Sequence, residues 1–314
     1  MRGESMAEGG GKTAARPRRY RLAGQAVEAP PLAPGLYVVA TPIGNLRDIT
    51  LRALETLAGA DLIACEDTRV TGKLTHHYGI ETPLAPYHEH NAAVARPKIL
   101  RRLAEGAAVA LVSDAGTPLV SDPGFKLVRA AQEAGFAVSA VPGASAVLAA
   151  LASAGLPTDR FTFEGFLPPK PAARRTRIAT LARIPTTLVF FETGPRLAAT
   201  LADLAAGLGA RAACVLRELT KLHEEIRRGT LPDLAVTFAD APPPRGEIVV
   251  VIGPPAEGGA REPGEVEERL RKALRRVSLK DAVAEVAVVT GESRSAVYRT
   301  ALALSREDKD EAPD

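Results

Sequence analysis

The segment 112–124, V-S-D-A-G-T-P-L-V-S-D-P-G, holds more turn-forming and polar residues than one β-turn requires. Its two glycines can adopt backbone angles closed to other residues, and its two prolines stiffen the path. Asp114 and Asp122 add carboxylates suited to ribose hydroxyls, an amino group or a cation. The alternative is a strand-to-helix turn capped by ordinary turn formers. Because long loops in compact domains are commonly functional, the segment is interpreted as a ligand-binding loop.

Four predicted strands end in unusual polar or turn-rich sequences. They are 36–40 before T-P-I-G-N-L-R-D, 61–65 before E-D-T-R, 107–112 before the loop above, and 137–141 before P-G-A-S-A. The alternation of strands with helices predicts a largely parallel sheet covered on both faces. Since the carboxyl ends of parallel strands share one edge, where ligands bind in open α/β sheets, the four loops are expected to line one cleft.

Composition along the chain predicts five parts. Residues 1–34 are rich in Gly, Pro and Arg and are expected to form a disordered basic extension. Residues 35–156 predict an N-terminal α/β domain and residues 157–254 a second α/β domain. After a Pro/Gly linker, residues 264–304 have the apolar spacing of a small helical domain, and residues 305–314 are expected to form a disordered acidic tail.

The charge balance, the cysteine content and the hydropathy of the chain disfavour several classes of protein. The balance of 40 basic and 37 acidic residues gives a net charge of only +3, so an RNA partner must meet a local basic patch. Cys65 and Cys214 lie too far apart in the sequence to indicate a disulfide framework. No segment has the character of a signal peptide or a membrane span, so a soluble cytoplasmic protein is expected.

Familiar catalytic and cofactor signatures are missing from the sequence. It has no G-x-G-x-x-G, which argues against a nicotinamide or flavin cofactor. It also has no G-x-S-x-G elbow, the motif of serine hydrolases. Four histidines, at positions 76, 77, 88 and 90, gather within fifteen residues, but their spacing matches no familiar zinc site. They are interpreted as a polar lip on the cleft, and no metal is expected.

A basic cluster begins at Lys170 and continues through Arg174, Arg175, Arg177 and Arg183. Two interpretations stay open. The cluster is either a solvated helix face or a set of phosphate contacts that positions an RNA without specifying its sequence.

Eight segments, taken in order, resemble the bacterial 16S rRNA (cytidine-2′-O)-methyltransferases, a branch of the tetrapyrrole methylase superfamily. The segments are A-T-P-I-G-N-L-R-D-I-T, E-D-T-R-V-T-G-K-L, Y-H-E-H-N, S-D-A-G-T-P-L-V-S-D-P-G, V-P-G-A-S-A, F-E-G-F-L-P-P-K, R-E-L-T-K-L-H-E-E and G-E-I-V-V-V-I. The similarity covers residues 36 to about 304. It departs from the family at F-F-E-T-G-P-R, residues 190–196, where Pro-His commonly precedes the Arg, and the N-terminal extension matches nothing in the family.

The resemblance implies an α/β fold made of two α/β domains of the tetrapyrrole-methylase type with a cleft between them, plus a small C-terminal helical domain. It also implies S-adenosylmethionine as cofactor, a homodimer, and a cytidine ribose in the 16S rRNA of the small ribosomal subunit as acceptor. Neither a metal nor a membrane is implied.

Site residues are assigned by placing this resemblance on the predicted strand ends. Cofactor contacts are expected from Pro42, Ile43, Gly44, Asp114, Gly116, Thr117, Val120, Ser145, Ala146, Glu192, Gly246 and Glu247. The acceptor side is assigned to Asn45, Glu66, Asp67 and Arg69, with Lys170, Arg174 and Arg175 on RNA phosphates. Glu66 or Asp67 is the candidate general base, although a structural salt bridge to Arg69 explains these residues equally well.

Two rival functions remain open at this point. A small-molecule tetrapyrrole methylase would keep the fold and the cofactor, and it would need no RNA. A non-catalytic RNA-binding factor in ribosome assembly would use the basic cluster and the C-terminal helices, and it would not depend on the 112–124 loop.

Overall fold

The computed structural model describes residues 18–255, 265–290 and 293–310. The chain divides into two units, Met1–Pro254 and Pro255–Asp314, which are taken separately below. None of the described helices is long and apolar enough to cross a membrane.

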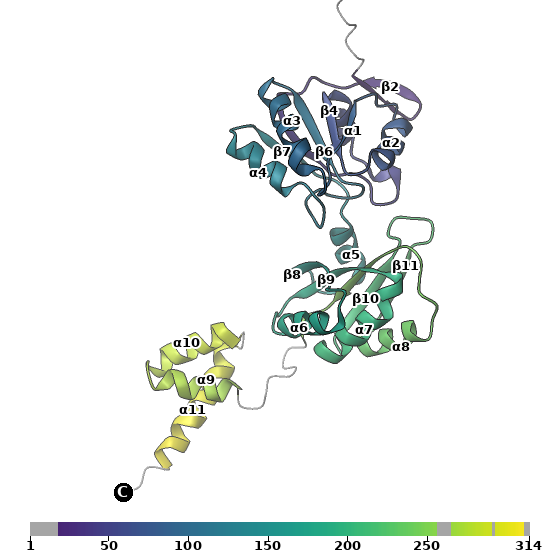
Figure 1. Ribbon diagram of the computed structural model, residues 1–314. Coiled ribbons are helices and arrows are strands. Elements are labelled where there is room, and N and C mark those ends of the chain that lie inside the picture. The colour runs from purple at the N-terminus through teal and green to yellow at the C-terminus, as the bar shows by residue number, and fades with distance from the viewer. Residues whose placement is uncertain (1–17, 256–264, 291–292, 311–314) are drawn as a thin grey trace, which may run out of the picture. The chain divides into compact units, whose positions relative to one another are not determined.

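The first lobe of the larger unit is a five-stranded sheet in the order β5-β4-β6-β3-β7, and every neighbouring pair is parallel (Figure 1). Its strands are β3 (Gly35–Val39), β4 (Leu62–Cys65), β5 (Leu84–Pro86), β6 (Ala108–Val112) and β7 (Val138–Val141). Its helices are η1 (Leu46–Asp48), α1 (Leu51–Gly59), α2 (Thr68–His77), α3 (Ala92–Ala104) and α4 (Phe125–Glu133). All residues of β4 and β6 are buried, and apolar clusters cover both faces of the sheet. The predicted parallel sheet is confirmed.

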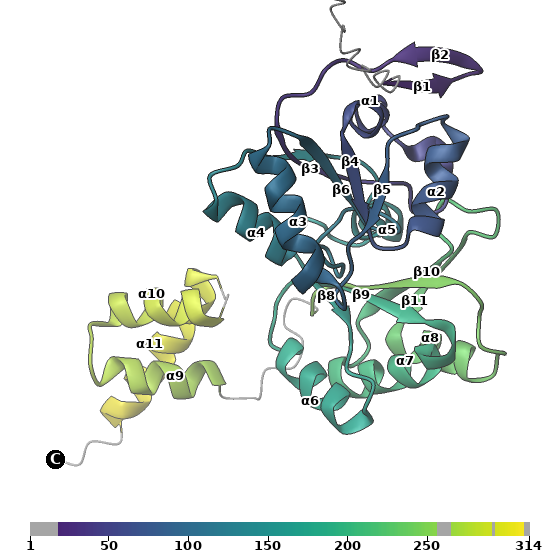
Figure 2. The same cartoon turned by 45° about the horizontal axis from the view of Figure 1, so that its top comes forward.

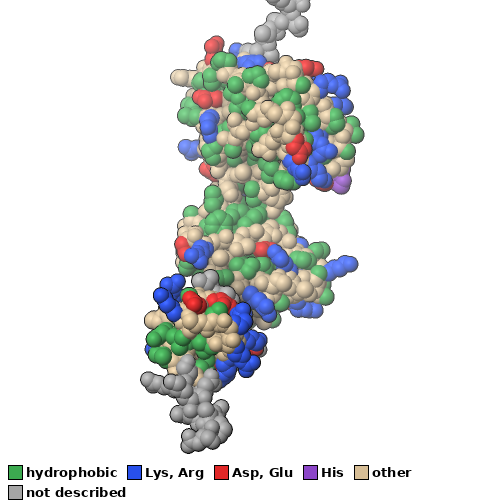
Figure 3. Space-filling model, turned by 90° about the vertical axis from the view of Figure 1, so that its left-hand side faces the viewer, with side chains coloured by type: hydrophobic (Ala, Val, Ile, Leu, Met, Phe, Trp, Pro, Cys, Tyr) green, Lys and Arg blue, Asp and Glu red, His purple; other side chains and the backbone are tan. Residues whose placement is uncertain are grey.

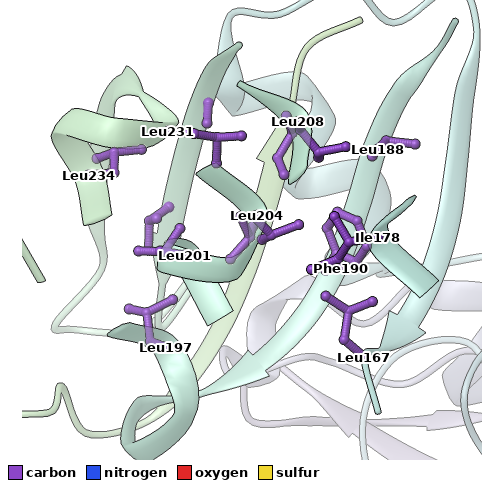
Figure 4. Close-up of a cluster of buried hydrophobic side chains, with 14 of the residues drawn as sticks. Leu167, Ile178, Leu188, Phe190, Leu197, Leu201, Leu204, Leu208, Leu231 and Leu234 are labelled. Atoms are coloured by element: carbon purple, nitrogen blue, oxygen red, sulfur yellow. The ribbon is translucent and has the colours of Figure 1, made fainter. Parts of the chain in front are cut away.

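The second lobe is a sheet in the order β11-β10-β12-β9-β8, in which only β8 and β9 pair in parallel. Its strands are β8 (Phe161–Phe166), β9 (Thr187–Thr193), β10 (Ala212–Arg217), β11 (Glu225–Thr230) and β12 (Glu247–Ile252). Its helices are α6 (Pro171–Leu181), α7 (Gly194–Leu208) and α8 (Leu231–Ala239). Leucines of α7 pack on Phe190 and on the start of α8 (Figure 4).

Helix α5 (Ala146–Ala154) follows β7 of the first lobe and packs on β10 and β12 of the second. Its small apolar residues belong to the same buried cluster as Ile43, Val189 and Leu219. Val189 and Phe191 therefore face α5, whereas the alternating residues Leu188 and Phe190 face the opposite cluster. The β3 loop and the second sheet thus share one core.

Part of the predicted N-terminal extension is ordered. β1 (Arg19–Leu22) and β2 (Gln25–Glu28) form an antiparallel hairpin that contacts α1 (Figure 2). Tyr20 is buried against the first lobe, and Arg18 pairs with Asp61 at 2.6 Å. Residues 18–34 therefore differ from the expected disorder, because ion pairs and apolar contacts with the first lobe anchor a segment of low apolar content. Residues 1–17 lie outside the described residues.

The smaller unit contains α9 (Glu265–Leu274), α10 (Leu279–Thr290) and α11 (Arg294–Asp310), as the helical spacing predicts. Leu270, Ala282, Val297 and Ala301 are buried where the helices meet. α11 extends to Asp310, beyond the predicted boundary at 304, so residues 305–310 are helical rather than a disordered tail. Residues 311–314 lie outside the described residues.

Candidate functional site

Direct hydrogen bonds join the loops that follow β3, β4, β6 and β7. Thr41 and Gly116 exchange two backbone hydrogen bonds, of 2.9 and 3.0 Å. The hydroxyl of Thr117 donates to the carbonyl of Ala144 at 3.2 Å. The Asp67 N–H donates to Oδ1 of Asp114 at 3.0 Å. The four predicted loops therefore meet at the carboxyl edge of the first sheet.

The β6 loop holds several residues in the left-handed region of backbone space. Gly116 has a φ of 77°, and two residues with side chains, Leu119 and Ser121, have φ values of 74° and 65°. A Cβ on Gly116 would lie 3.3 Å from Cγ2 of Ile43. Such conformations are costly for residues with side chains and persist where surrounding structure fixes them, most often at functional sites.

The cofactor residues predicted from the first lobe gather around this contact. Pro42, Ile43 and Gly116 are buried, Thr117, Ser145 and Ala146 are half-buried, and Gly44, Asp114 and Val120 are exposed. Among the described residues, the backbone N–H groups of Gly44, Thr117 and Ser145 have no hydrogen-bond acceptor. Free N–H donors beside an exposed carboxylate suit the carboxylate, ribose and amino groups of S-adenosylmethionine, so the residues fit that cofactor.

The second lobe reaches this region through the hairpin between β10 and β11. The Lys221 ammonium pairs with Glu218 at 2.8 Å and with Glu247 at 2.7 Å. Its side-chain carbons lie over Gly44 so closely that a Cβ there would collide with them. Gly246, at a φ of 98°, lies against Glu218 in the same way. The predicted residues Gly246 and Glu247 are therefore connected to the β3 loop.

Lys221 was not among the predicted site residues. It lies in the R-E-L-T-K-L-H-E-E segment, which contributed to the family resemblance without a role for any of its residues. A lysine between glutamates in sequence reads as an ordinary exposed turn, and only the fold places it over Gly44.

Glu192 lies in β9 in register with Ile248, next to the predicted residue Glu247, but its side chain is buried. Its carboxylate accepts hydrogen bonds from the Thr193 N–H at 2.8 Å and the Thr200 hydroxyl at 2.7 Å, and it pairs with Arg196 at 3.2 Å. Strand alternation places it on the α7 face of β9, opposite the face that packs on α5. Its side chain anchors the start of α7.

The two candidate bases have opposite electrostatic environments. Burial raises the pKa of the Glu66 carboxyl, and the negative charges of neighbouring aspartates raise it further. Asp67, by contrast, receives hydrogen bonds from the Arg69 side chain and backbone, which lower its pKa from 3.8 to about 2. Asp67 is also the N-cap of α2. The general base is therefore better sought in Glu66, and the Asp67–Arg69 pair has a structural explanation.

Asp122 lies with Glu66 near the same edge. Burial raises the pKa of Asp122, a hydrogen bond from Ser113 lowers it, and the charge of Asp114 raises it again. The sequence predicted Asp122 as a loop carboxylate suited to a ribose hydroxyl, an amino group or a cation, without assigning it to the site residues. Asn45, predicted on the acceptor side, is half-buried and caps η1 by accepting a hydrogen bond from the Arg47 N–H at 3.1 Å.

The predicted RNA-binding cluster is divided by the fold. Arg174 is 5% exposed and pairs with Asp203 of α7 at 2.6 Å, so its guanidinium holds two helices together. It is therefore not available to phosphates, which corrects its assignment. Lys170 and Arg175 are exposed, although Arg175 lies 3.5 Å from Asp203.

The predicted histidines lie in two places, with His76 and His77 in the last turn of α2 and His88 and His90 after β5. The rings of His88 and His90 have centroids 6.1 Å apart. A pocket of about 100 Å³ lies close by, between Tyr87 and Asp122. Among the residues that the structure describes, no three His, Cys, Asp or Glu side chains form a group that could hold a metal ion.

Two family profiles match the chain. The tetrapyrrole (corrin/porphyrin) methylases match residues 35–235, which cover the first lobe and most of the second. The RsmI C-terminal HTH domain matches residues 260–305 in the helical unit. Among solved structures, cobalt precorrin-4 methyltransferase, a cobalamin biosynthetic enzyme, is 20% identical with a TM-score of 0.54, covering 69% of this chain and 94% of its own. The methyltransferase CobJ is 23% identical with a TM-score of 0.54, covering 70% and 94%. These structures share the fold.

Curated relatives are much more similar in sequence. The ribosomal RNA small subunit methyltransferase I of Mesorhizobium japonicum is 52% identical over 279 residues, covering 88% of this chain and 95% of its own. The protein of the same name from Erythrobacter litoralis is 52% identical, covering 88% and 97%. That from Pseudomonas aeruginosa is 48% identical, covering 85% and 96%. The chain therefore belongs to the ribosomal RNA small subunit methyltransferase I family, within the tetrapyrrole methylases.

Proposed function

We propose that this protein methylates the ribose 2′-oxygen of a cytidine in 16S rRNA, with S-adenosylmethionine as the methyl donor. The observation that carries the proposal is the meeting of four strand-end loops around the Thr41–Gly116 contact, in a chain of this family. The relatives' names support methylation of small-subunit rRNA. The family resemblance supplies the finer assignment to a cytidine ribose. A homodimer and a cytoplasmic location are parts of the same proposal.

S-adenosylmethionine, when bound, supplies a methyl group activated by a positive sulfur. Free N–H groups of Gly44, Thr117 and Ser145 and the carboxylate of Asp114 would hold it. The Thr41–Gly116 and Thr117–Ala144 bonds fix these groups relative to one another before any ligand binds. Alignment of two reactants by a prearranged site can provide roughly 7–11 kcal/mol of the rate enhancement.

Glu66 would accept the proton of the ribose hydroxyl. A hydroxyl is a poor nucleophile, and a positioned base typically contributes about two to four orders of magnitude. The raised pKa of Glu66 makes it a stronger base than an exposed glutamate. Lys170 and Arg175 are exposed and would contact RNA phosphates.

Methyl incorporation tests the proposal against its rivals. Purified protein and labelled S-adenosylmethionine are incubated with small ribosomal subunits, with naked 16S rRNA and with a tetrapyrrole. Mass spectrometry then locates the methyl group in the RNA. We expect a 2′-O-methylcytidine in subunits or rRNA and no tetrapyrrole product. A methyl group on a base, or methylation of the tetrapyrrole without RNA, would contradict the proposal.

The non-catalytic alternative is tested by equilibrium binding of labelled S-adenosylmethionine. Thr117→Arg places a long side chain beside the Thr117–Ala144 contact, so we expect binding by the wild type and none by the variant. Absence of binding to the wild type, with RNA binding intact, would favour an assembly factor.

A further inference from the structure

Helix α11 presents an outward face that carries positive charge and an aromatic ring. Arg294, Tyr298 and Leu302 follow one another at a spacing of four residues and therefore share one face of the helix. Tyr298 is 45% exposed and Leu302 is 37% exposed. Val297 and Ala301, on the other side, are buried against the neighbouring helices, which fixes the orientation of the exposed face.

The described part of this face carries positive charge. Arg294 and Arg299 are exposed, and residues 293–304 contain no Asp or Glu. Neither arginine has an ion-pair partner among the described residues. In the same unit, by contrast, Lys272 pairs with Glu268 at 2.6 Å and Arg276 pairs with Glu285 at 2.9 Å. Figure 3 shows Lys and Arg side chains gathered on this helical unit.

We propose that the α11 face, defined by Arg294, Ser295, Tyr298, Arg299 and Leu302, binds unpaired nucleotides of the rRNA substrate. This inference rests on the proposed function and names a second contact with the same substrate. The arginines bind backbone phosphates, and the ring of Tyr298 stacks on an unstacked base. Stacking is tolerant of sequence because every base has a π-face.

Single-stranded RNA is the form of RNA that this surface fits. The major groove of A-form RNA is deep and narrow, and side chains of a helix cannot read it. The ring of an exposed tyrosine between arginines cannot reach the bases inside that groove. Loops and bulges, by contrast, expose unstacked bases together with their phosphates. The α11 face therefore distinguishes a hairpin loop from a continuous duplex.

The test uses the full chain and two fluorescent RNA probes of equal length and charge, one a hairpin with an unpaired loop and one a continuous duplex. Fluorescence anisotropy gives the affinities at several salt concentrations. We expect Tyr298→Ala to weaken hairpin binding about tenfold, the effect of losing one base stack, and Tyr298→Phe to retain it. Loss of both Arg294 and Arg299 to Ala should weaken binding and reduce the salt slope by about 1.4.

Lys280→Ala is the matched control, because Lys280 is exposed on α10 and lies outside the α11 face. It should reduce hairpin affinity less than the double arginine change does, and thermal melting should show all variants folded. Equal binding of hairpin and duplex, or variants that bind the hairpin as the wild type does, would overturn the inference. Methylation of rRNA by the wild type is measured separately. If the wild type methylates rRNA but the variants bind the hairpin as the wild type does, only the inference about the α11 face is refuted. If the variants lose hairpin affinity as expected but the wild type does not methylate rRNA, only the proposed function is refuted.

Discussion

The two lobes use polar residues differently. In the first lobe, backbone hydrogen bonds between loops hold Gly116 and its neighbours in left-handed conformations, and the exposed Asp114 carboxylate stays at the surface. In the second lobe, the charged residues Arg174 and Glu192 are buried and paired within their own lobe. The hairpin that carries Lys221 reaches the β3 loop, and Gly165 of β8 lies against Ser121 of the β6 loop. The buried ion pairs of the second lobe therefore stabilise its fold, whereas the first lobe keeps polar loop residues at its surface.

The largest effect is expected in the β6 loop. Gly116→Ala puts a side chain at a φ of 77° and a Cβ 3.3 Å from Ile43. The left-handed conformation alone costs roughly 1–2 kcal/mol, and the close contact shifts the loop that holds Thr117. We expect methyl transfer to fall by about three orders of magnitude, since a misplacement of one ångström can cost about two and ligand binding is lost as well.

Gly135→Ala is the matched control for this change. Gly135 has a φ of 78°, and a Cβ there would meet nothing within 4 Å. Both variants should lose similar stability in thermal melting, and only Gly116→Ala should lose activity. Equal activity in the two would mean that the β6 loop is not part of the site.

Glu66→Gln is expected to reduce kcat by about two orders of magnitude or more, because the base is lost while its shape is kept. Affinity for S-adenosylhomocysteine, measured by calorimetry, should not change. In the wild type, kcat should fall as the pH drops through the raised pKa of Glu66, and this limb should disappear in the variant. An unchanged kcat would remove Glu66 from the role of base.

The raised pKa of Glu66 also determines the direction in which Glu66→Gln changes the stability. The folded-state pKa of Glu66 is raised above 4.5, so the unfolded chain releases this proton first and stability decreases as the pH rises through that window. Glu66→Gln should therefore be at least as stable as the wild type at neutral pH.

Asp67→Asn should have the opposite effect and lower the stability at neutral pH. The pKa of Asp67 is lowered from 3.8 to about 2, so its contribution is present above pH 3.8 and lost as the pH falls toward 2.

In the second lobe, Arg174→Met should lower the free energy of unfolding by about 3 kcal/mol, because it leaves the largely buried Asp203 without its main partner. Denaturant unfolding measures this loss. Arg175→Ala, which removes an exposed neighbour on the same helix, should cost less than about 1 kcal/mol. If Arg174→Met stayed stable but lost RNA affinity, the original assignment to phosphate binding would be restored.

Among the changes that alter activity, the smallest effect is expected at the connection between the lobes. Lys221→Met keeps most of the side chain over Gly44 and removes the charge between Glu218 and Glu247. We expect the KM for S-adenosylmethionine to rise about tenfold, equivalent to 1.4 kcal/mol, with kcat nearly unchanged. Steady-state kinetics at saturating RNA separates the two constants. A loss confined to kcat would instead assign Lys221 to the reaction step.

The sequence predicted the parallel first sheet and the meeting of its loops because both follow from local signals. Buried strands read as apolar runs, and the carboxyl ends of parallel strands must share an edge. The bounds 247–252 of the last strand also agree with β12. The three helices of the smaller unit follow from their apolar spacing.

The sequence did not predict which side chains contact one another. Arg174 and Arg175 are adjacent and identical in type, yet α6 buries one against Asp203 and exposes the other. The residue before Glu192 in β9 faces α5. Only the register of β9 decides that Glu192 itself faces the other side of the sheet. Lys221 acquires its contact with Gly44 through a hairpin far away in sequence. The ordered residues 18–34 depend likewise on the partners of Tyr20 and Arg18.

Hydrogen exchange of the full chain, followed by mass spectrometry with and without saturating S-adenosylhomocysteine, most directly tests whether the strand-end loops bind the cofactor. The account predicts slower exchange in residues 41–45, 113–124 and 142–147, with a smaller effect around Lys221. Protection confined to other segments, while these three exchange at unchanged rates, would contradict it.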